Sequence, residues 1–208
     1  RTLEMLTSVL RDGLAGDVVS VSSFGAESAV LLHLVARIDP SLPVLFLDTG
    51  KHFQETLDYR DLLISRLGLT DLRNLTPDAA QLAKRDETGL RWSYDPDGCC
   101  EIRKVAPLAE ALLGFDASLT GRKGFQSATR AGLPRFEIDT SDAQGRLKIN
   151  PLADWTSDDI AAYFAKYDLP PHPLVAEGYP SIGCSPCTTK VAPGEDPRSG
   201  RWKGWDKV

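Results

Sequence analysis

Short apolar runs alternate with longer amphipathic stretches over the first two thirds of this 208-residue chain. We interpret four apolar runs as strands, at residues 18–21, 44–47, 72–75 and 117–119. The stretches between them carry apolar residues at helical spacing and predict helices at residues 27–38, 53–67, 79–85 and 105–113. Such an alternation specifies a doubly wound, mostly parallel α/β sheet.

The last third of the chain has a different pattern. Residues 135–149 predict two strands joined by a turn. Thr156, with Asp159 three residues later, predicts the capped start of a final helix. From Leu169 onward proline and glycine dominate, so we expect little regular structure there. The sequence therefore predicts a single domain over residues 1–208 with an irregular C-terminal segment.

Composition and charge exclude several classes of function. The formal net charge is −5, which argues against a general role on nucleic acid or on a membrane surface. No apolar run approaches the roughly 18 residues that a membrane helix needs. Nothing at the N-terminus reads as a signal peptide, so we expect a reducing, cytoplasmic location.

The four cysteines of the sequence fall into two tight groups, Cys99 with Cys100 and Cys184 with Cys187. Four thiolates held together are what an iron–sulfur cluster or a tetrahedral zinc ion requires. Neighbouring residues rarely aim both sulfurs at one ion, whereas a cluster with several irons can take one thiolate per iron. The pattern therefore favours a [4Fe–4S] cluster over zinc, with disulfides and buried structural cysteines as weaker alternatives.

Two polar segments follow predicted strands, where ligands bind in sheets of this kind. Residues 22–28 read Ser-Ser-Phe-Gly-Ala-Glu-Ser and lead into the first long helix. Small residues there let backbone N–H groups approach an anion at the helix N-terminus. Residues 48–50 read Asp-Thr-Gly. Neither segment matches the phosphate loop of nucleotide triphosphatases or the dinucleotide-binding fingerprint.

Taken together, these motifs resemble the assimilatory sulfonucleotide reductases, specifically the iron–sulfur-containing adenylyl-sulfate (APS) reductases. The resemblance rests on residues 22–28, 47–50, 99–104, 120–122, 150–155 and 183–188, and on the Arg198, Arg201 and Trp202 tail. Its most specific element is the Cys-Cys pair combined with Cys-x-x-Cys, because the phosphoadenylyl-sulfate (PAPS) reductases typical of enteric bacteria lack it. The resemblance implies an adenine nucleotide alpha hydrolase-like fold.

The resemblance also implies a reaction. A cysteine thiolate attacks the sulfur of APS and expels AMP, which leaves an enzyme S-sulfocysteine. Thioredoxin or a similar dithiol then releases sulfite, in assimilatory sulfate reduction and cysteine biosynthesis. The cluster would shape the potential around the substrate sulfate and would not pass electrons.

The substrate-binding residues follow from the same resemblance. Lys104 matches a lysine between cluster and substrate, and Arg198 and Arg201 match arginines that grip the phosphosulfate. The remaining implied contacts are Ser22, Ser23, Phe24, Gly25, Glu27, Ser28, Asp48, Thr49, Gly50, Gly121 and Arg122. The loop reads Ser-Ser-Phe-Gly where many relatives read Ser-Phe-Ser-Gly, so no contact is assigned to one particular serine.

One part of the family pattern is absent. The family's nucleophile lies in a Glu-Cys-Gly-x-His ending, whereas all four cysteines here match cluster ligands. We therefore expect the nucleophile just beyond Val208 and no catalytic thiol within the chain.

Three alternatives stay open at this stage. They are a cluster-containing PAPS reductase, an iron–sulfur tRNA-thiolation enzyme of the pyrophosphatase-loop fold, and a non-enzymatic iron–sulfur sensor or nucleotide-binding module. A tRNA enzyme should show a Ser-Gly-Gly-x-Asp-Ser loop and a basic face, and the sequence has neither. APS and thioredoxin are the expected partners, while a homo-oligomer and the physiological reductant remain open.

Overall fold

The computed structural model describes residues 1–127 and 130–205. Within these residues, a six-stranded sheet has the order β3-β2-β1-β4-β6-β5. The strands are β1 (Val18–Val21), β2 (Val44–Leu47), β3 (Leu72–Leu75), β4 (Ala117–Thr120), β5 (Phe136–Ile138) and β6 (Leu147–Ile149). Every neighbouring pair is parallel except β5 with β6. The predicted α/β class, with its mostly parallel sheet, is confirmed.

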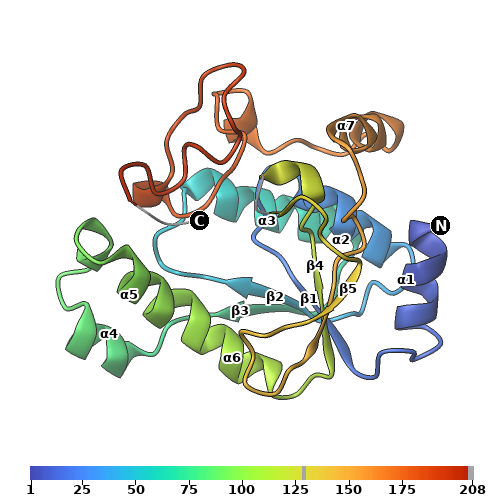
Figure 1. Cartoon of the computed structure of the whole chain (residues 1–208), viewed down its shortest axis with the longest axis horizontal. Coiled ribbons are helices and arrows are strands. Elements are labelled where there is room, and N and C mark those ends of the chain that lie inside the picture. The colour runs from blue at the N-terminus through green and yellow to red at the C-terminus, as the bar shows by residue number, and fades with distance from the viewer. Residues whose placement is uncertain (128–129, 206–208) are drawn as a thin grey trace.

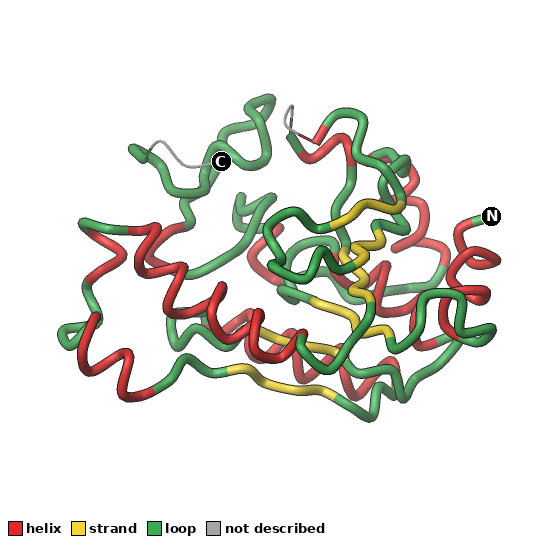
Figure 2. Tube along the Cα trace, turned by 60° about the horizontal axis from the view of Figure 1, so that its bottom comes forward, coloured by secondary structure: helices red, strands yellow, loops and turns green. Residues whose placement is uncertain are grey.

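Helices cover both faces of the sheet, as Figures 1 and 2 show. They are α1 (Thr2–Leu10), α2 (Ser28–Ala36), α3 (Gln54–Leu67), α4 (Ala79–Arg85), α5 (Pro96–Cys100), α6 (Ala106–Leu112) and α7 (Ser157–Lys166). On one face, α1, α2 and α7 pack against β1, β4 and β6, and α2 and α3 pack against β2. On the other face, Leu112 of α6 packs against Val19 and Leu45. Alternate residues of the buried strands therefore serve two separate cores.

Most of the predicted elements form, with two differences. Thr156 Oγ1 accepts a hydrogen bond from the Asp159 N–H at 3.1 Å, and the Asp159 carboxylate accepts one from the Thr156 N–H at 2.8 Å. This reciprocal pair confirms the predicted start of α7. The first difference is α1, which was not predicted. The second is that helical structure begins at Pro96, well before the predicted residue 105.

The C-terminal segment from Leu169 contains only short turns in its described part, η5 (Pro173–Val175) and η6 (Ser185–Cys187). It packs along α3, where the Tyr59 hydroxyl donates to the Pro170 carbonyl at 2.7 Å. Beyond η5 the segment reaches the loop after β2, because His52 and Cys184 form an antiparallel bridge. The irregular segment thus lies over the strand ends where ligands are expected.

No helix in the described part of the chain combines the length and the apolar character that crossing a membrane requires.

Candidate functional site

A cavity of about 560 Å³ opens beside the carboxyl ends of β1 and β4. Ten of the fourteen expected substrate contacts line it, and so do Cys184 and Trp202; the ten are Ser22, Ser23, Gly25, Glu27, Ser28, Lys104, Gly121, Arg122, Arg198 and Arg201. These residues come from four separate parts of the chain. The fold therefore brings the strand-end loops, the segment after the cysteine pair and the C-terminal segment to one place.

The loop between β1 and α2 is fixed by its own hydrogen bonds. Ser22 Oγ accepts from the Phe24 N–H at 3.2 Å, and Ser28 Oγ donates to the Gly25 carbonyl at 2.8 Å. Phe24 has a φ of +49° and is fully buried against Phe46. Its side chain therefore anchors the loop in the core and does not line the cavity. A strained φ at a ligand-facing turn is tolerated when packing holds it in this way.

The loop after β2 lies beside the second cysteine pair, and Cys184 of that pair lines the cavity. Asp48 Oδ1 accepts from the Gly50 N–H at 3.1 Å, and Thr49 Oγ1 lies 3.2 Å from the Cys184 sulfur. Gly50 has a φ of +70°, which glycine adopts without strain. Asp48, Thr49 and Gly50 are not among the residues that line the cavity. Leu47 and His52, on either side of these three residues, do line it.

An ion pair between buried Lys123 and partly exposed Glu27 lies at the start of α2. Lys123 is only 2% exposed, and its Nζ lies 3.0 Å from Glu27 Oε2 and donates to the Gly121 carbonyl at 2.6 Å. Gln126 Nε2 also donates to Glu27, at 3.1 Å. Burial lowers the pKa of Lys123, while Glu27 acts to raise it. Sequence reasoning missed Lys123, since nothing in its neighbours signals that it is buried.

Several arginines converge on the cavity. Burial, followed by the charges of Arg198, Arg122 and Arg201, lowers the pKa of Arg130 to about 10. Burial also lowers the pKa of Arg201, and Arg198 adds to the effect. Arg122 is paired with Glu137. Cations held this close to one another favour a ligand with several negative charges. Arg130 was not predicted from the sequence, and its place two residues after the Gln-Ser-Ala run gives no signal of its own.

Three of the cationic side chains lie within about 6 Å of the centre of the Trp202 ring. The Lys104 Nζ lies 5.8 Å from the centre of this ring, and the Arg198 and Arg201 guanidinium carbons lie at 5.9 Å and 4.5 Å. Attraction between a cation and the face of a ring stabilises such contacts. Trp202 therefore connects the lysine after the cysteine pair with the two arginines of the C-terminal segment.

The two cysteine pairs lie close enough for the charge on one pair to shift the thiol pKa of the other. Burial raises the pKa of Cys187, and the other three cysteines raise it further. Burial likewise raises the pKa of Cys99, whereas Arg103 lowers it. All four are free thiols. Among residues 1–127 and 130–205, no group of three or more His, Cys, Asp or Glu side chains is spaced to hold a metal ion. Thiols are nevertheless the donors that a [4Fe–4S] cluster uses, so the chemistry of these four residues fits such a group.

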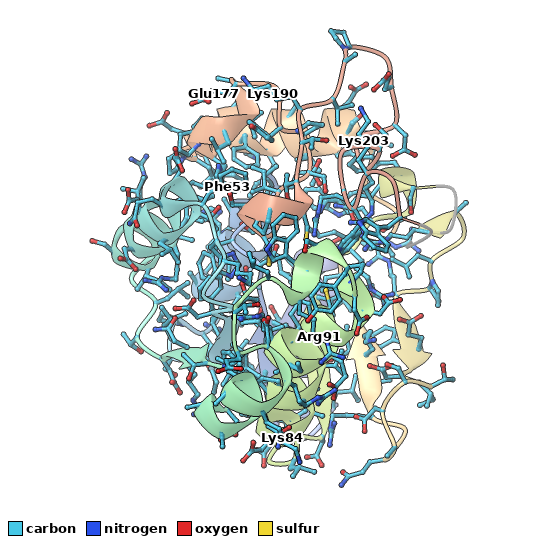
Figure 3. The ribbon with its side chains drawn as sticks, turned by 90° about the vertical axis from the view of Figure 1, so that its left-hand side faces the viewer. Phe53, Lys84, Arg91, Glu177, Lys190 and Lys203 are labelled. Atoms are coloured by element: carbon cyan, nitrogen blue, oxygen red, sulfur yellow. The ribbon has the colours of Figure 1, made fainter. Side chains whose placement is uncertain are left out.

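A π-helical turn follows Cys99 and Cys100, and its residues point both into the protein and toward the cavity. The turn η2 (Glu101–Val105) joins α5 to α6. It buries Ile102 and Arg103, while Lys104 reaches the cavity. Turns of this kind are rare and occur often at functional sites. In the projection of Figure 3, Arg91 is drawn between Lys84 of α4 and the C-terminal segment that carries Lys190 and Lys203.

Comparison with known proteins gives consistent similarities. The family model for the phosphoadenosine phosphosulfate reductase domain matches residues 17–190. The chain is 52% identical over 208 residues to an adenosine 5'-phosphosulfate reductase of Mesorhizobium japonicum, covering 100% of this chain and 80% of the relative. It is 45% identical over 182 residues to the reductase of that name from Mycobacterium tuberculosis, covering 86% and 70%.

Solved structures agree on the fold. The structure of phosphoadenylyl-sulfate reductase from Candida auris matches with a TM-score of 0.74 and 26% identity, covering 91% of this chain and 90% of that one. Yeast FAD synthetase matches with a TM-score of 0.63 and 17% identity, covering 91% and 64%, and indicates the fold alone. Together with the family match, these similarities show that the chain belongs to the family defined by the phosphoadenosine phosphosulfate reductase domain.

Proposed function

We propose that this protein is an adenylyl-sulfate reductase, which converts APS to sulfite and AMP. The observation that carries the proposal is the convergence of Lys104, Arg130, Arg198 and Arg201 on one cavity beside the four cysteines. A phosphosulfate carries several anionic oxygens, and guanidinium groups recognise such oxygens in pairs. The relatives that share about half of the residues carry the name adenosine 5'-phosphosulfate reductase.

We place the nucleotide along the loop of residues 22–28, with its anhydride toward the cationic side chains. Support comes from the position of that loop at the start of α2, where backbone N–H groups favour an anion. The ion pair of Glu27 with Lys123 keeps the Glu27 carboxylate bound on the protein side. The loop can then present its N–H groups to the substrate without a free carboxylate competing for them.

We propose that Cys99, Cys100, Cys184 and Cys187 hold a [4Fe–4S] cluster. When bound, this group would add a fixed local charge that shapes the potential around Lys104 and the substrate sulfate. Lys104 is the residue of this chain that would respond to that potential, and its contact with the Trp202 ring helps to fix its position. Lys104 would bind the sulfate oxygens, while Arg198 and Arg201 bind the anhydride from the opposite segment.

The proposed reaction requires a thiol outside the cysteine quartet. Its thiolate forms a bond to the sulfur of APS while the bond from that sulfur to the bridging oxygen breaks, and AMP leaves with the oxygen and its electron pair. A thiolate of thioredoxin then attacks the cysteine sulfur, and sulfite leaves with the electrons of the broken bond. The cations would stabilise the charge that builds up on the leaving phosphate. We assign this reaction to assimilatory sulfate reduction in the cytoplasm.

Equilibrium binding of APS, PAPS and AMP tests the proposal on the chain itself. APS should bind at least about tenfold more tightly than AMP, because a charged hydrogen bond to the sulfate contributes about 1.5–3 kcal/mol. The Lys104→Ala, Arg198→Ala and Arg201→Ala variants should each lose part of this difference, because AMP has neither the sulfate nor the anhydride that these side chains would bind. Arg66→Ala removes an exposed arginine paired with Asp168 and should bind APS as the wild type does. Tighter binding of PAPS would favour the PAPS reductase alternative, and no binding of either would contradict the proposal.

A further inference from the structure

Asp86 is a fully buried carboxylate at the end of α4, with its side chain 0% exposed. Its Oδ2 accepts from Arg103 Nη2 at 2.7 Å and from Nε at 3.2 Å. Its Oδ1 accepts from the backbone N–H of Arg91 at 2.9 Å. Both carboxylate oxygens are therefore used within the protein, and neither lines the cavity.

Arg103 links the region of the first cysteine pair to the region of the second. It lies on the π-helical turn that follows Cys100, and its Nη1 donates to the Thr49 carbonyl at 2.7 Å. The hydroxyl of Thr49 lies 3.2 Å from the Cys184 sulfur. A continuous chain of polar contacts thus joins Asp86, the turn after Cys100, and Cys184.

A second set of contacts ties the same parts together. Lys51 Nζ donates to the Gly89 carbonyl, and the Lys51 carbonyl accepts from the Ser185 N–H at 2.7 Å. Arg91, whose N–H binds Asp86, also donates to Asp95 Oδ2 from Nη2 at 2.7 Å. Asp95 in turn accepts from the Gly98 N–H at 2.8 Å and so caps α5, the helix that carries Cys99 and Cys100.

We propose that Asp86 is a positioning residue that sets the separation and relative orientation of the two cysteine pairs. It acts through the guanidinium of Arg103, whose fork is aimed at Asp86 and at the Thr49 carbonyl together. Without the Asp86 charge, Arg103 would be a buried cation without its partner, which is strongly unfavourable. The guanidinium would then turn away, and the loop after β2, whose Thr49 hydroxyl lies beside the Cys184 sulfur, would lose its contact with the turn after Cys100. The consequence for a cluster rests on the cofactor part of the proposed function.

Iron release to a chelator measures this positioning in Asp86→Asn, a variant of nearly unchanged shape. We expect iron to leave the reconstituted variant about tenfold or more faster than the wild type, the scale typical of residues that orient metal ligands. The matched control is Asp142→Asn, which breaks a buried pair with Arg146 at the β5–β6 turn, where side-chain exposures are 14% and 5%. This control should lose thermal stability but keep the wild-type rate of iron release. Equal rates in both variants would assign Asp86 a merely structural role.

Arg103→Lys provides a second route if Asp86→Asn does not fold. Lysine keeps the charge but cannot bind Asp86 and the Thr49 carbonyl with one fork, so iron release should again be faster. A wild-type rate in Arg103→Lys would contradict the proposal.

Cross-linking of the iron-free thiols separates this inference from the cofactor proposal. A short reagent with two thiol-reactive ends should join Cys100 to Cys187 in the wild type, as read by mass spectrometry of peptides. We expect at least about fivefold less of this product in Asp86→Asn, because this change removes the partner of the Arg103 guanidinium. We expect no change in Asp142→Asn, which affects Arg146 instead. Unchanged cross-linking would overturn the inference. If the wild type fails to bind iron and yet gives more cross-linked product than Asp86→Asn, the cluster is refuted and the positioning role is supported.

Discussion

The backbone N–H of Trp202 donates to the carbonyl of Cys187 at 3.0 Å. Next to this bond, Thr188 and Arg201 form an antiparallel bridge, and the Thr189 N–H donates to the Gly200 carbonyl at 2.8 Å. The segment with the second cysteine pair and the segment with the arginines are therefore one structural unit. We therefore expect a shift of Cys187 to move the cationic groups around the Trp202 ring as well.

Gly183→Ala should weaken APS binding with little effect on stability. A Cβ at this position would lie 2.2 Å from Arg201 Nη2, so the flexible Arg201 side chain must move away. Loss of its charged hydrogen bond predicts an affinity about tenfold lower or more. Equilibrium binding measures this effect. Gly114→Ala is the control, since nothing lies within 4 Å of its added Cβ. Unchanged affinity in Gly183→Ala would show that Arg201 does not contact the substrate.

Arg130→Ala should stabilise the protein while weakening its binding of APS. Burial, and then the charges of three neighbouring arginines, lower the pKa of Arg130, so its removal relieves both the desolvation of a charge and the repulsion. Cations that are held together to bind an anion repel one another in its absence, so such a site lowers the folding stability of the protein. We expect a higher Tm and an affinity for APS at least about tenfold lower. A lower Tm with unchanged affinity would exclude Arg130 from the anion site.

Lys123→Met should destabilise the protein strongly, because it leaves the Glu27 carboxylate without its buried partner. The expected loss of unfolding free energy is about 1–3 kcal/mol, because the Glu27 carboxylate is partly exposed and keeps its bond from Gln126. In the Glu27→Gln/Lys123→Met double variant, the loss should be clearly smaller than the sum of the two single losses. Urea denaturation of all four proteins gives the coupling energy. Additive losses would mean that the two side chains do not stabilise each other.

His172 should make stability depend on pH. Burial lowers the pKa of His172 to about 4, from an ordinary value of 6.5. Its Nδ1 accepts from the Leu174 N–H at 3.2 Å, and its Nε2 lies 2.9 Å from Thr56 Oγ1, so the fold holds the neutral ring. Between pH 6.5 and about 4 the unfolded chain binds a proton that the fold excludes.

The unfolding free energy should therefore fall as the pH drops through this window, by about 3 kcal/mol in total. It should become insensitive to this histidine above pH 6.5 and below about 4. Chemical denaturation at a series of pH values measures the slope. His172→Gln should remove this part of the dependence, and an unchanged slope in that variant would assign the effect to other groups.

The sequence predicted the sheet because the apolar runs of β1, β2 and β4 are buried on both faces and short. Ten of the fourteen substrate contacts expected from the sequence line the cavity, whereas Phe24, Asp48, Thr49 and Gly50 do not. The sequence did not predict the helical start at Pro96, because a π-helical turn has no simple hydrophobic period. The burial of Lys123 and the charge crowding at Arg130 depend on contacts between distant segments, which periodicity does not encode.

Formation of sulfite from APS tests the central claim most directly. The measurement compares the 208-residue chain with the same chain extended by a Glu-Cys-Gly-x-His tail, each supplied with reduced thioredoxin. We predict sulfite only from the extended chain, with none when the tail cysteine is changed to serine, and binding of APS by all three proteins. Sulfite release that continues without the tail cysteine, or its absence from an extended chain that binds APS, would contradict the proposed reaction.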